Sequence, residues 1–234
     1  MSHINLKDIQ QKLYDGLKPS GWGDKLKGFI LSDEFYQILV FLYGEINEGH
    51  RFTPILKQLF RAFEECPYDK LKVVVIGQDP YPKAGVADGI AFSCSNTGVI
   101  QASLKYIFGE MHRTISSDYV QNPNLARWSN QGILMLNTPL TTRVGEVGIH
   151  ADIWKGFIEY LFDTLNSYNN GLVYVFMGDK AKAWKDHINK NNYKFFITHP
   201  ASAAYKEAQY WDSGDVFNQI NYVLKENYNT QITW

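Results

Sequence analysis

A run of apolar, mostly β-branched residues at 71–76 leads directly into the segment 77–82, which reads GQDPYP. Such a run is typical of a buried strand, and a glycine followed closely by two prolines ends a strand abruptly. The carboxylate of Asp79 is therefore expected just beyond a strand end, where open parallel sheets bind their ligands. An aspartate that only caps the next segment would give the same pattern, and for an isolated strand this is the better interpretation.

Three further apolar runs end in a similar way. The runs 133–136, 172–177 and 195–198 are followed by Asn137, Gly178-Asp179 and His199-Pro200. The segments between the runs are long enough for crossover helices, so the pattern predicts an α/β fold with a central four-stranded parallel sheet and helices on both faces. Asp79, Asn137, Asp179 and His199 should then converge at one edge of the sheet.

The helical segments are expected to complete a single domain that spans residues 1–234. Apolar residues at helical spacing predict helices at 35–46, 55–63, 103–113, 154–165 and 217–226, with Pro54 at the start of the second. Residues 1–70 are thus expected to be mostly helical, and residues 71–234 to hold the sheet and the loops of the site.

Composition limits the possible partners and location. The net charge of 234 residues is −1, so a nucleic acid would have to be held by a local basic patch. Cys66 and Cys94 have no metal-binding spacing, which favours reduced thiols in a cytoplasmic protein. No apolar run approaches the roughly 20 residues of a membrane span. We expect a monomer without membrane contact, metal or cofactor.

Several of these segments resemble one enzyme family. The segment GQDPY at 77–81, followed by GIAFS at 89–93, resembles the water-activating motif of family 1 uracil-DNA glycosylases. The segment LMLN at 134–137 resembles the uracil-recognition strand of that family, and residues 199–205 resemble its DNA-intercalation loop. The resemblance covers roughly residues 22–234, and the motifs occur in the order of the family.

The resemblance implies hydrolysis of the N-glycosidic bond of deoxyuridine in single- or double-stranded DNA, after the base has left the stack. It implies two catalytic residues. Asp79 would orient the attacking water and stabilise the oxocarbenium-like sugar, and His199 would donate a hydrogen bond to the uracil O2. A proteinaceous glycosylase inhibitor is a second candidate partner.

The resemblance also assigns the residues that bind uracil and DNA. Asn137 would pair with the uracil N3–H and O4, and cytosine, with the opposite donor pattern, would leave buried groups unpaired. Tyr81 would exclude the thymine methyl group, Phe92 would stack on the base, and Gln78 would contribute a backbone amide. The implied DNA contacts are Pro82, Ser103, Gly178, Ala201, Ser202, Ala203 and Tyr205.

The chain departs from the family at several positions. Pro82 and Asp88 stand where the family has histidines, and Asp179 stands where it has a phosphate-binding serine, so Asp179 is expected to cap the following helix. The leucine that fills the space of the flipped nucleotide is replaced by Ala203 or Ser202. This predicts a preference for single-stranded DNA or U·G over a U·A duplex, unless a nearby large side chain takes over; the candidates are Tyr205, Lys206, Tyr210 and Trp211.

Two other functions fit parts of the pattern. A DNA-binding accessory protein with weak or absent catalysis would explain the altered intercalation loop. Such a protein would not need all five motif residues, namely Asp79, Tyr81, Phe92, Asn137 and His199. A metal-dependent hydrolase could use Asp79, His150 and His199. The chain has six histidines and no HExxH or HxxxH spacing, which disfavours the second alternative.

Overall fold

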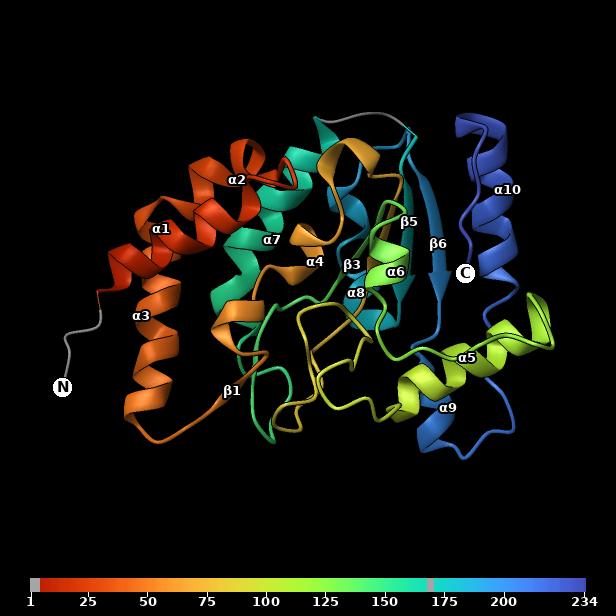
Figure 1. Cartoon of the computed structure of the whole chain (residues 1–234), viewed down its shortest axis with the longest axis horizontal. Helices are drawn as coiled ribbons and strands as arrows, with labels where there is room; N and C mark the ends of the chain where they lie inside the picture. Colours follow the sequence, from red (N-terminus) through yellow and green to blue (C-terminus); the bar gives the residue numbers. More distant parts are fainter. Residues whose placement is uncertain (1–4, 168–170) are drawn as a thin grey trace.

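Four parallel strands lie at the centre of the fold, in the order β3-β2-β5-β6 (Figure 1). They are β2 (Val73–Ile76), β3 (Ile133–Leu136), β5 (Val173–Met177) and β6 (Tyr193–Ile197). The structure, a computed structural model, describes residues 5–167 and 171–234. The predicted four-stranded parallel sheet is therefore confirmed, and residues 1–4 of the N-terminal part lie outside the described residues.

The register of the strands aligns their carboxyl ends. Ile76 of β2 lies opposite Leu136 of β3 and Phe176 of β5. The strands β2, β3 and β5 are buried along their whole length, whereas the edge strand β6 is partly exposed. Continuous apolar runs are what a parallel sheet covered on both faces requires. The residues that follow these strands are consequently held at one common edge.

Helices cover both faces of the sheet, as the sequence predicts. Figure 1 shows α7 (Ala151–Asn166) and the three N-terminal helices on one side of the sheet and α10 (Val216–Tyr228) on the other. On the α10 side, Phe217, Val75 and Ile107 of α5 (Ala102–Thr114) line one small cavity in the core. The predicted helices at 103–113, 154–165 and 217–226 are confirmed.

The N-terminal helices are joined to the sheet by aromatic packing. The helices are α1 (Leu6–Leu17), α2 (Trp22–Ile30) and α3 (Asp33–Asn47), and α3 confirms the helix expected at 35–46. The Ser32 side chain accepts a hydrogen bond from the Phe35 N–H and so caps the start of α3. Phe157 of α7 lies in edge or tilted contact with Phe29 of α2 and with two rings of the segment before β2, Phe60 and Phe63.

The helix predicted at 55–63 is wrong. Instead, β1 (Phe52–Thr53) pairs with β4 (Thr142–Arg143), and a short 3₁₀ turn, η1 (Leu56–Gln58), precedes α4 (Arg61–Glu64). A side chain at Gly89 would come within 2.0 Å of the Gln58 carbonyl oxygen. The chain breaks its helix here because the loop around Gly89 packs directly against the backbone.

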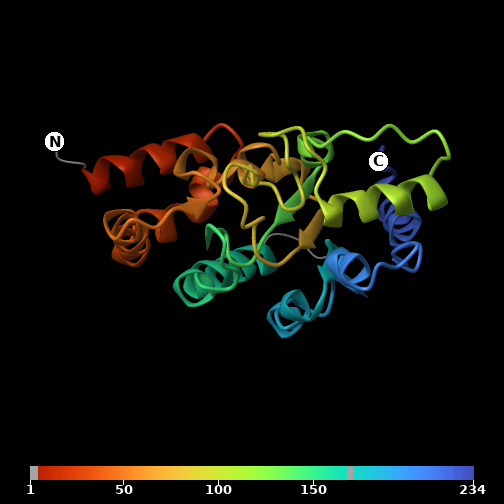
Figure 2. The ribbon, with the colours of Figure 1, turned by 90° about the horizontal axis from the view of Figure 1, so that it is seen from below.

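The remaining elements are short and lie at the ends of strands. They are η2 (Tyr68–Lys70), α6 (Ala126–Ser129), α8 (Asp179–Lys182), η3 (Lys185–His187) and α9 (Pro200–Tyr205). Figure 2 looks onto the carboxyl ends of the strands, where the loops after β2 occupy the centre of the view. Within the described ranges, no helix is both long and apolar enough to cross a membrane.

Candidate active site

A cavity of about 750 Å³ opens at the carboxyl edge of the sheet. Asp79, Asn137, Asp179 and His199 all line it, so the convergence predicted from the strand ends is confirmed. Most of the other expected site residues line the same cavity: Gln78, Tyr81, Pro82, Phe92, Ser103, Gly178, Ala201, Ser202 and Tyr205. The sheet therefore gathers residues that are more than 100 positions apart in the sequence.

Both carboxylate oxygens of Asp79 have partners. Its Oδ1 accepts a hydrogen bond from the Gly148 N–H at 2.5 Å, and its Oδ2 forms an ion pair with the Lys180 Nζ at 3.1 Å. The Asp79 side chain is only 7% exposed, whereas that of Lys180 is 57% exposed. The carboxylate is thus held in a fixed orientation within the cavity, and it does not cap a following helix.

Asn137 follows β3 directly and lies against Gly77. A side chain at Gly77 would come within 2.8 Å of the Asn137 Oδ1 and 3.4 Å of the Phe92 ring. Glycine at this position therefore leaves the space that Asn137 and Phe92 occupy. Among the residues that the structure describes, none hydrogen-bonds the Asn137 amide, so both its donor and its acceptor are available to a ligand in the cavity.

Tyr81 and Phe92 form one wall of the cavity and are linked to each other. The Tyr81 hydroxyl donates a hydrogen bond to the Phe92 carbonyl oxygen at 3.0 Å. Phe92 has a φ of 65°, a left-handed backbone conformation that a bulky residue rarely adopts without support. Burial raises the pKa of the Tyr81 hydroxyl, so the group remains protonated and keeps its role as donor.

Asp88 is a positioning residue that sequence reasoning missed. Its side chain is fully buried and accepts hydrogen bonds from the hydroxyls of Ser93 and Ser95 at 2.6 and 2.5 Å. It also forms an ion pair with Arg61 at 2.8 Å. Because the Asp88 Oδ1 also accepts a hydrogen bond from the Ile90 N–H at 3.2 Å, the loop is held on both sides of Phe92. Nothing in the local sequence signals the pairing with Arg61, which comes from a different part of the chain.

His199 lies between β6 and α9 and presents one ring nitrogen to the cavity. Its Nδ1 accepts a hydrogen bond from the Ala201 N–H at 3.1 Å, so Nδ1 carries no proton. A neutral ring then carries its proton on Nε2. Burial lowers the pKa of His199 to about 4, and the opposing charge of Asp79 only partly offsets this effect. His199 is therefore a neutral hydrogen-bond donor near neutral pH.

Two neighbours fix the position of His199. The indole N–H of the buried Trp211 donates to the Thr198 Oγ1 at 2.9 Å, immediately before His199. A side chain at Gly178 would come within 2.3 Å of the Gln78 Nε2 and 2.9 Å of the His199 Cβ. Gly178, at φ 92°, therefore permits the close approach of Gln78 and His199 across β5.

The structure corrects two expectations about the DNA-contacting loops. Ala203 is 6% exposed and is absent from the cavity wall, because α9 packs against α5, so it cannot fill the space of a flipped nucleotide. Tyr205, at the end of α9, is 88% exposed and lies at the cavity. Asp179 is the first residue of α8 and makes no capping hydrogen bond with its side chain, since Gly178 occupies the cap position.

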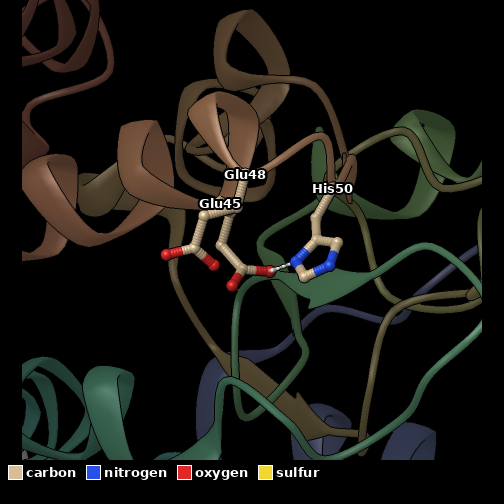
Figure 3. Close-up of side chains that lie close together, drawn as sticks. All are labelled: Glu45, Glu48 and His50. Carbon is tan, nitrogen blue, oxygen red and sulfur yellow. Dashed lines mark ion pairs between the residues drawn. The ribbon is translucent and has the colours of Figure 1, made fainter.

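In the part of the chain that the structure describes, no three His, Cys, Asp or Glu side chains of this cavity come close enough together to hold a metal ion. Within residues 5–167 and 171–234, the group with suitable spacing is Glu45, Glu48 and His50 (Figure 3), and none of the three lines the cavity. The Glu45 carboxylate already accepts hydrogen bonds from Arg143 at 2.6 and 2.7 Å. His150 is fully buried, with its Nδ1 2.8 Å from the Thr141 Oγ1. The hypothesis of a metal site at Asp79, His150 and His199 gains no support.

Comparison with known proteins identifies a family to which this chain is similar. The family model described as the uracil DNA glycosylase superfamily matches residues 63–225, which is more than half of the chain. A uracil-DNA glycosylase of Mesomycoplasma hyopneumoniae is 35% identical over 86% of this chain and 91% of its own length. One of Bacteroides thetaiotaomicron is 33% identical over 91% of this chain and 96% of its own length.

Solved structures with the same fold are also found. The crystal structure of mimivirus uracil-DNA glycosylase matches with a TM-score of 0.82 at 25% identity, over 99% of this chain and 89% of that chain. The Y322L variant of that enzyme, solved in complex with UGI, matches with a TM-score of 0.82 at 25% identity, over 98% of this chain and 90% of that chain.

Proposed function

Because this chain belongs to the uracil DNA glycosylase superfamily, we propose that it hydrolyses the N-glycosidic bond of deoxyuridine in DNA. The reaction releases uracil and leaves an abasic site, as the first step of base excision repair. The observation that carries this proposal is the convergence of Asp79, Asn137 and His199 on one cavity that Phe92 and Tyr81 also line.

We propose that Asp79 and His199 act on the two charges that develop during the reaction. As the bond between C1′ and N1 breaks, the sugar becomes cationic and uracil leaves as an anion. The Asp79 carboxylate would stabilise the sugar and orient the water that adds to C1′. The Nε2–H of the neutral His199 would donate a hydrogen bond to the uracil O2. Loss of one such donor typically costs about 3 kcal/mol of transition-state stabilisation.

We propose that three side chains select uracil. The unengaged Asn137 amide can donate to O4 and accept from N3–H, a pattern that cytosine does not match. The Phe92 ring, 5.4 Å from the His199 ring between centroids, would form the stacking surface for the base. Tyr81, anchored to the Phe92 carbonyl, would occupy the space that a thymine methyl group needs.

The test is release of the base from oligonucleotides with a single uracil, in single strands and duplexes, with thymine and cytosine substrates as controls. The reaction mixture contains a chelator. We expect uracil release that is insensitive to the chelator and slower by orders of magnitude in Asp79→Asn, whose fold should be unchanged. A protein that binds the DNA but releases no base would instead be a DNA-binding accessory protein.

We further propose that the protein works as a monomer on DNA in the cytoplasm, and that UGI inhibits it. Support for the last point comes from the similar mimivirus variant solved in complex with UGI. Titration of UGI into the uracil-release assay tests the inhibition, and light scattering during size-exclusion chromatography tests the monomeric state. Cell fractionation tests the location, and the protein is expected in the cytoplasmic fraction.

A further inference from the structure

Lys180 forms an ion pair with Asp79, the carboxylate that is proposed to stabilise the cationic sugar. A positive charge is unexpected here, because it offsets the negative charge of Asp79. The Lys180 Nζ lies 3.1 Å from the Asp79 Oδ2, and a side chain at Gly148 would lie 3.5 Å from the same nitrogen. The ammonium group therefore covers the one carboxylate oxygen that the Gly148 N–H leaves open. In this arrangement the ammonium competes with a water for the Asp79 Oδ2 and offsets the negative charge of the carboxylate.

The contact can be exchanged at little cost. Although Asp79 is buried, Lys180 is more than half exposed, so water and salt compete with Asp79 for its ammonium group. The lysine ammonium is also a compact charge on a flexible stem, which can move between partners. Lys180 lines the cavity on α8, directly after Asp179. A substrate with a negative group at the cavity mouth can therefore draw the ammonium away from Asp79.

We propose that Lys180 is a specificity-determining residue that pairs with Asp79 in the free protein and with a backbone phosphate beside the flipped nucleotide in the complex. This inference rests on the proposed function. Binding of a phosphate-bearing strand then frees the Asp79 Oδ2 for the water and restores the full charge of the carboxylate. A free nucleoside has no such phosphate and leaves Asp79 paired. The ion pair thus contributes up to about fivefold to the selection of DNA over free deoxyuridine.

The first experiment uses single-stranded oligonucleotides with one uracil, in which each neighbouring phosphate is replaced in turn by an uncharged methylphosphonate. In the wild-type protein, one of these replacements should raise KM more than the others. Lys180→Met should raise KM for the unmodified strand up to about fivefold without lowering kcat. The KM of the Lys180→Met variant should also be unchanged by that one methylphosphonate replacement. Lys180→Arg should keep both the KM and the position-specific effect.

Salt dependence gives an independent measurement. The slope of log K against log salt concentration should become shallower by about 0.7 in Lys180→Met, which is the loss of one phosphate contact on a single strand. Lys185→Met, an exposed lysine on η3 outside the cavity, is the charge-matched control and should not change sensitivity to any single methylphosphonate. A merely structural role of Lys180 would not produce a loss of sensitivity at one phosphate position.

The masking of Asp79 is tested by binding rather than by activity. Asp79→Asn should bind the uracil strand up to about fivefold more tightly, because Lys180 no longer has to leave a carboxylate. That gain should shrink in the double variant Asp79→Asn/Lys180→Met. The inference would be overturned if Asp79→Asn raised the affinity for the strand equally with and without the Lys180→Met substitution. It would also be overturned if the effects of Lys180→Met and of every methylphosphonate on KM were additive. A wild-type protein that releases no uracil would contradict the proposed function instead, so the two failures are distinguishable.

Discussion

The Tyr81 hydroxyl donates a hydrogen bond to the carbonyl oxygen of Phe92, a residue that lies 11 positions further along the chain. The bond joins the side chain proposed to exclude thymine to the ring proposed to stack on uracil. Because Phe92 adopts a left-handed backbone conformation, its orientation depends on such supports. Selectivity and stacking are therefore coupled through one hydroxyl group.

Two substitutions of Tyr81 should separate these contributions. Tyr81→Phe keeps the bulk of the ring, so thymine should still be refused, but the buried Phe92 carbonyl loses its partner at a cost of about 1 kcal/mol in the free energy of unfolding. Tyr81→Ala removes the bulk and should admit thymine. Denaturant unfolding and release of thymine from T-containing oligonucleotides check both results. Complete refusal of thymine by Tyr81→Ala would remove the steric role.

Asn137→Asp should shift recognition from uracil towards cytosine. The substitution replaces the amide donor with a second acceptor, which matches the cytosine amino group and repels the uracil O4. Uracil release should fall, and slow cytosine release should become measurable. Competing release from U- and C-containing strands in one reaction is the measurement, with the wild-type protein as the reference. Unchanged uracil release with cytosine still refused would show that Asn137 does not read the base.

The lowered pKa of His199 predicts how stability and activity depend on pH. The pKa of about 4 in the folded protein lies below the ordinary histidine pKa of 6.5, so the unfolded chain binds more protons between these values. The contribution of His199 to stability is therefore complete above about pH 6.5 and is lost as pH falls towards 4. Well above the pKa of about 4 the ring of His199 stays a neutral donor, so uracil release between mildly acidic and neutral pH should not depend on titration of His199.

The matched variant for this prediction is His199→Gln. Its free energy of unfolding should fall less than that of the wild type between pH 6.5 and pH 4, measured by urea denaturation at each pH. A wild-type rate of uracil release that falls from mildly acidic to neutral pH, with the fall abolished in His199→Gln, would instead indicate a cationic histidine.

The site could be predicted from sequence to the extent that it follows from the strand ends. Asp79, Asn137 and His199 follow buried apolar runs, and the parallel register brings the ends of such runs together. The pairing of Asp88 with Arg61 could not be predicted, because it depends on the break in the helix expected at 55–63. Charge alone does not reveal which partner a buried carboxylate finds.

The contact between Lys180 and Asp79 could not be predicted either, since the two residues are 101 positions apart and no sequence pattern links them. The burial of Ala203 is only weakly indicated by the sequence. Pro200 is suited to the first turn of a helix, and the alanine-rich segment that follows favours one, so a helix with a buried face was a possible expectation. The packing of that helix against α5 decides which alanine is buried, and only the fold provides it.

The buried carboxylate of Glu45 should stabilise the loop that delivers the Gly148 N–H to Asp79. Hydrogen bonds from Arg143 lower its pKa to about 2 in the folded protein, although burial acts in the opposite direction. Glu45→Gln leaves the Arg143 charge without its partner and should lower the free energy of unfolding at neutral pH by about 3 kcal/mol. The difference from the wild type should shrink as pH falls from about 4.5 towards 2, because the wild-type carboxylate then also loses its charge. A difference that is constant with pH would mean that the charge of Glu45 does not matter.

Ala203→Leu should destabilise the protein without improving its action on duplex DNA. The position is buried between α9 and α5, so three additional carbons would overpack the interface at a typical cost of 1–3 kcal/mol. Thermal unfolding measures the cost, and uracil release from a U·A duplex measures the second effect. A stable variant with faster release from the duplex would show that α9 opens and exposes Ala203 on DNA.

Tyr205 is the side chain best placed to occupy the space of a flipped nucleotide, because it is almost fully exposed at the cavity rim while Trp211 is buried. Stacking between an aromatic ring and a base contributes about 1–3 kcal/mol. Tyr205→Ala should therefore lower uracil release from a U·A duplex by about tenfold relative to release from a single strand, where no paired stack needs to be refilled. Tyr210→Ala, an exposed tyrosine outside the cavity wall, is the control and should leave this ratio unchanged. Equal losses on both substrates would mean that Tyr205 only contributes general DNA affinity.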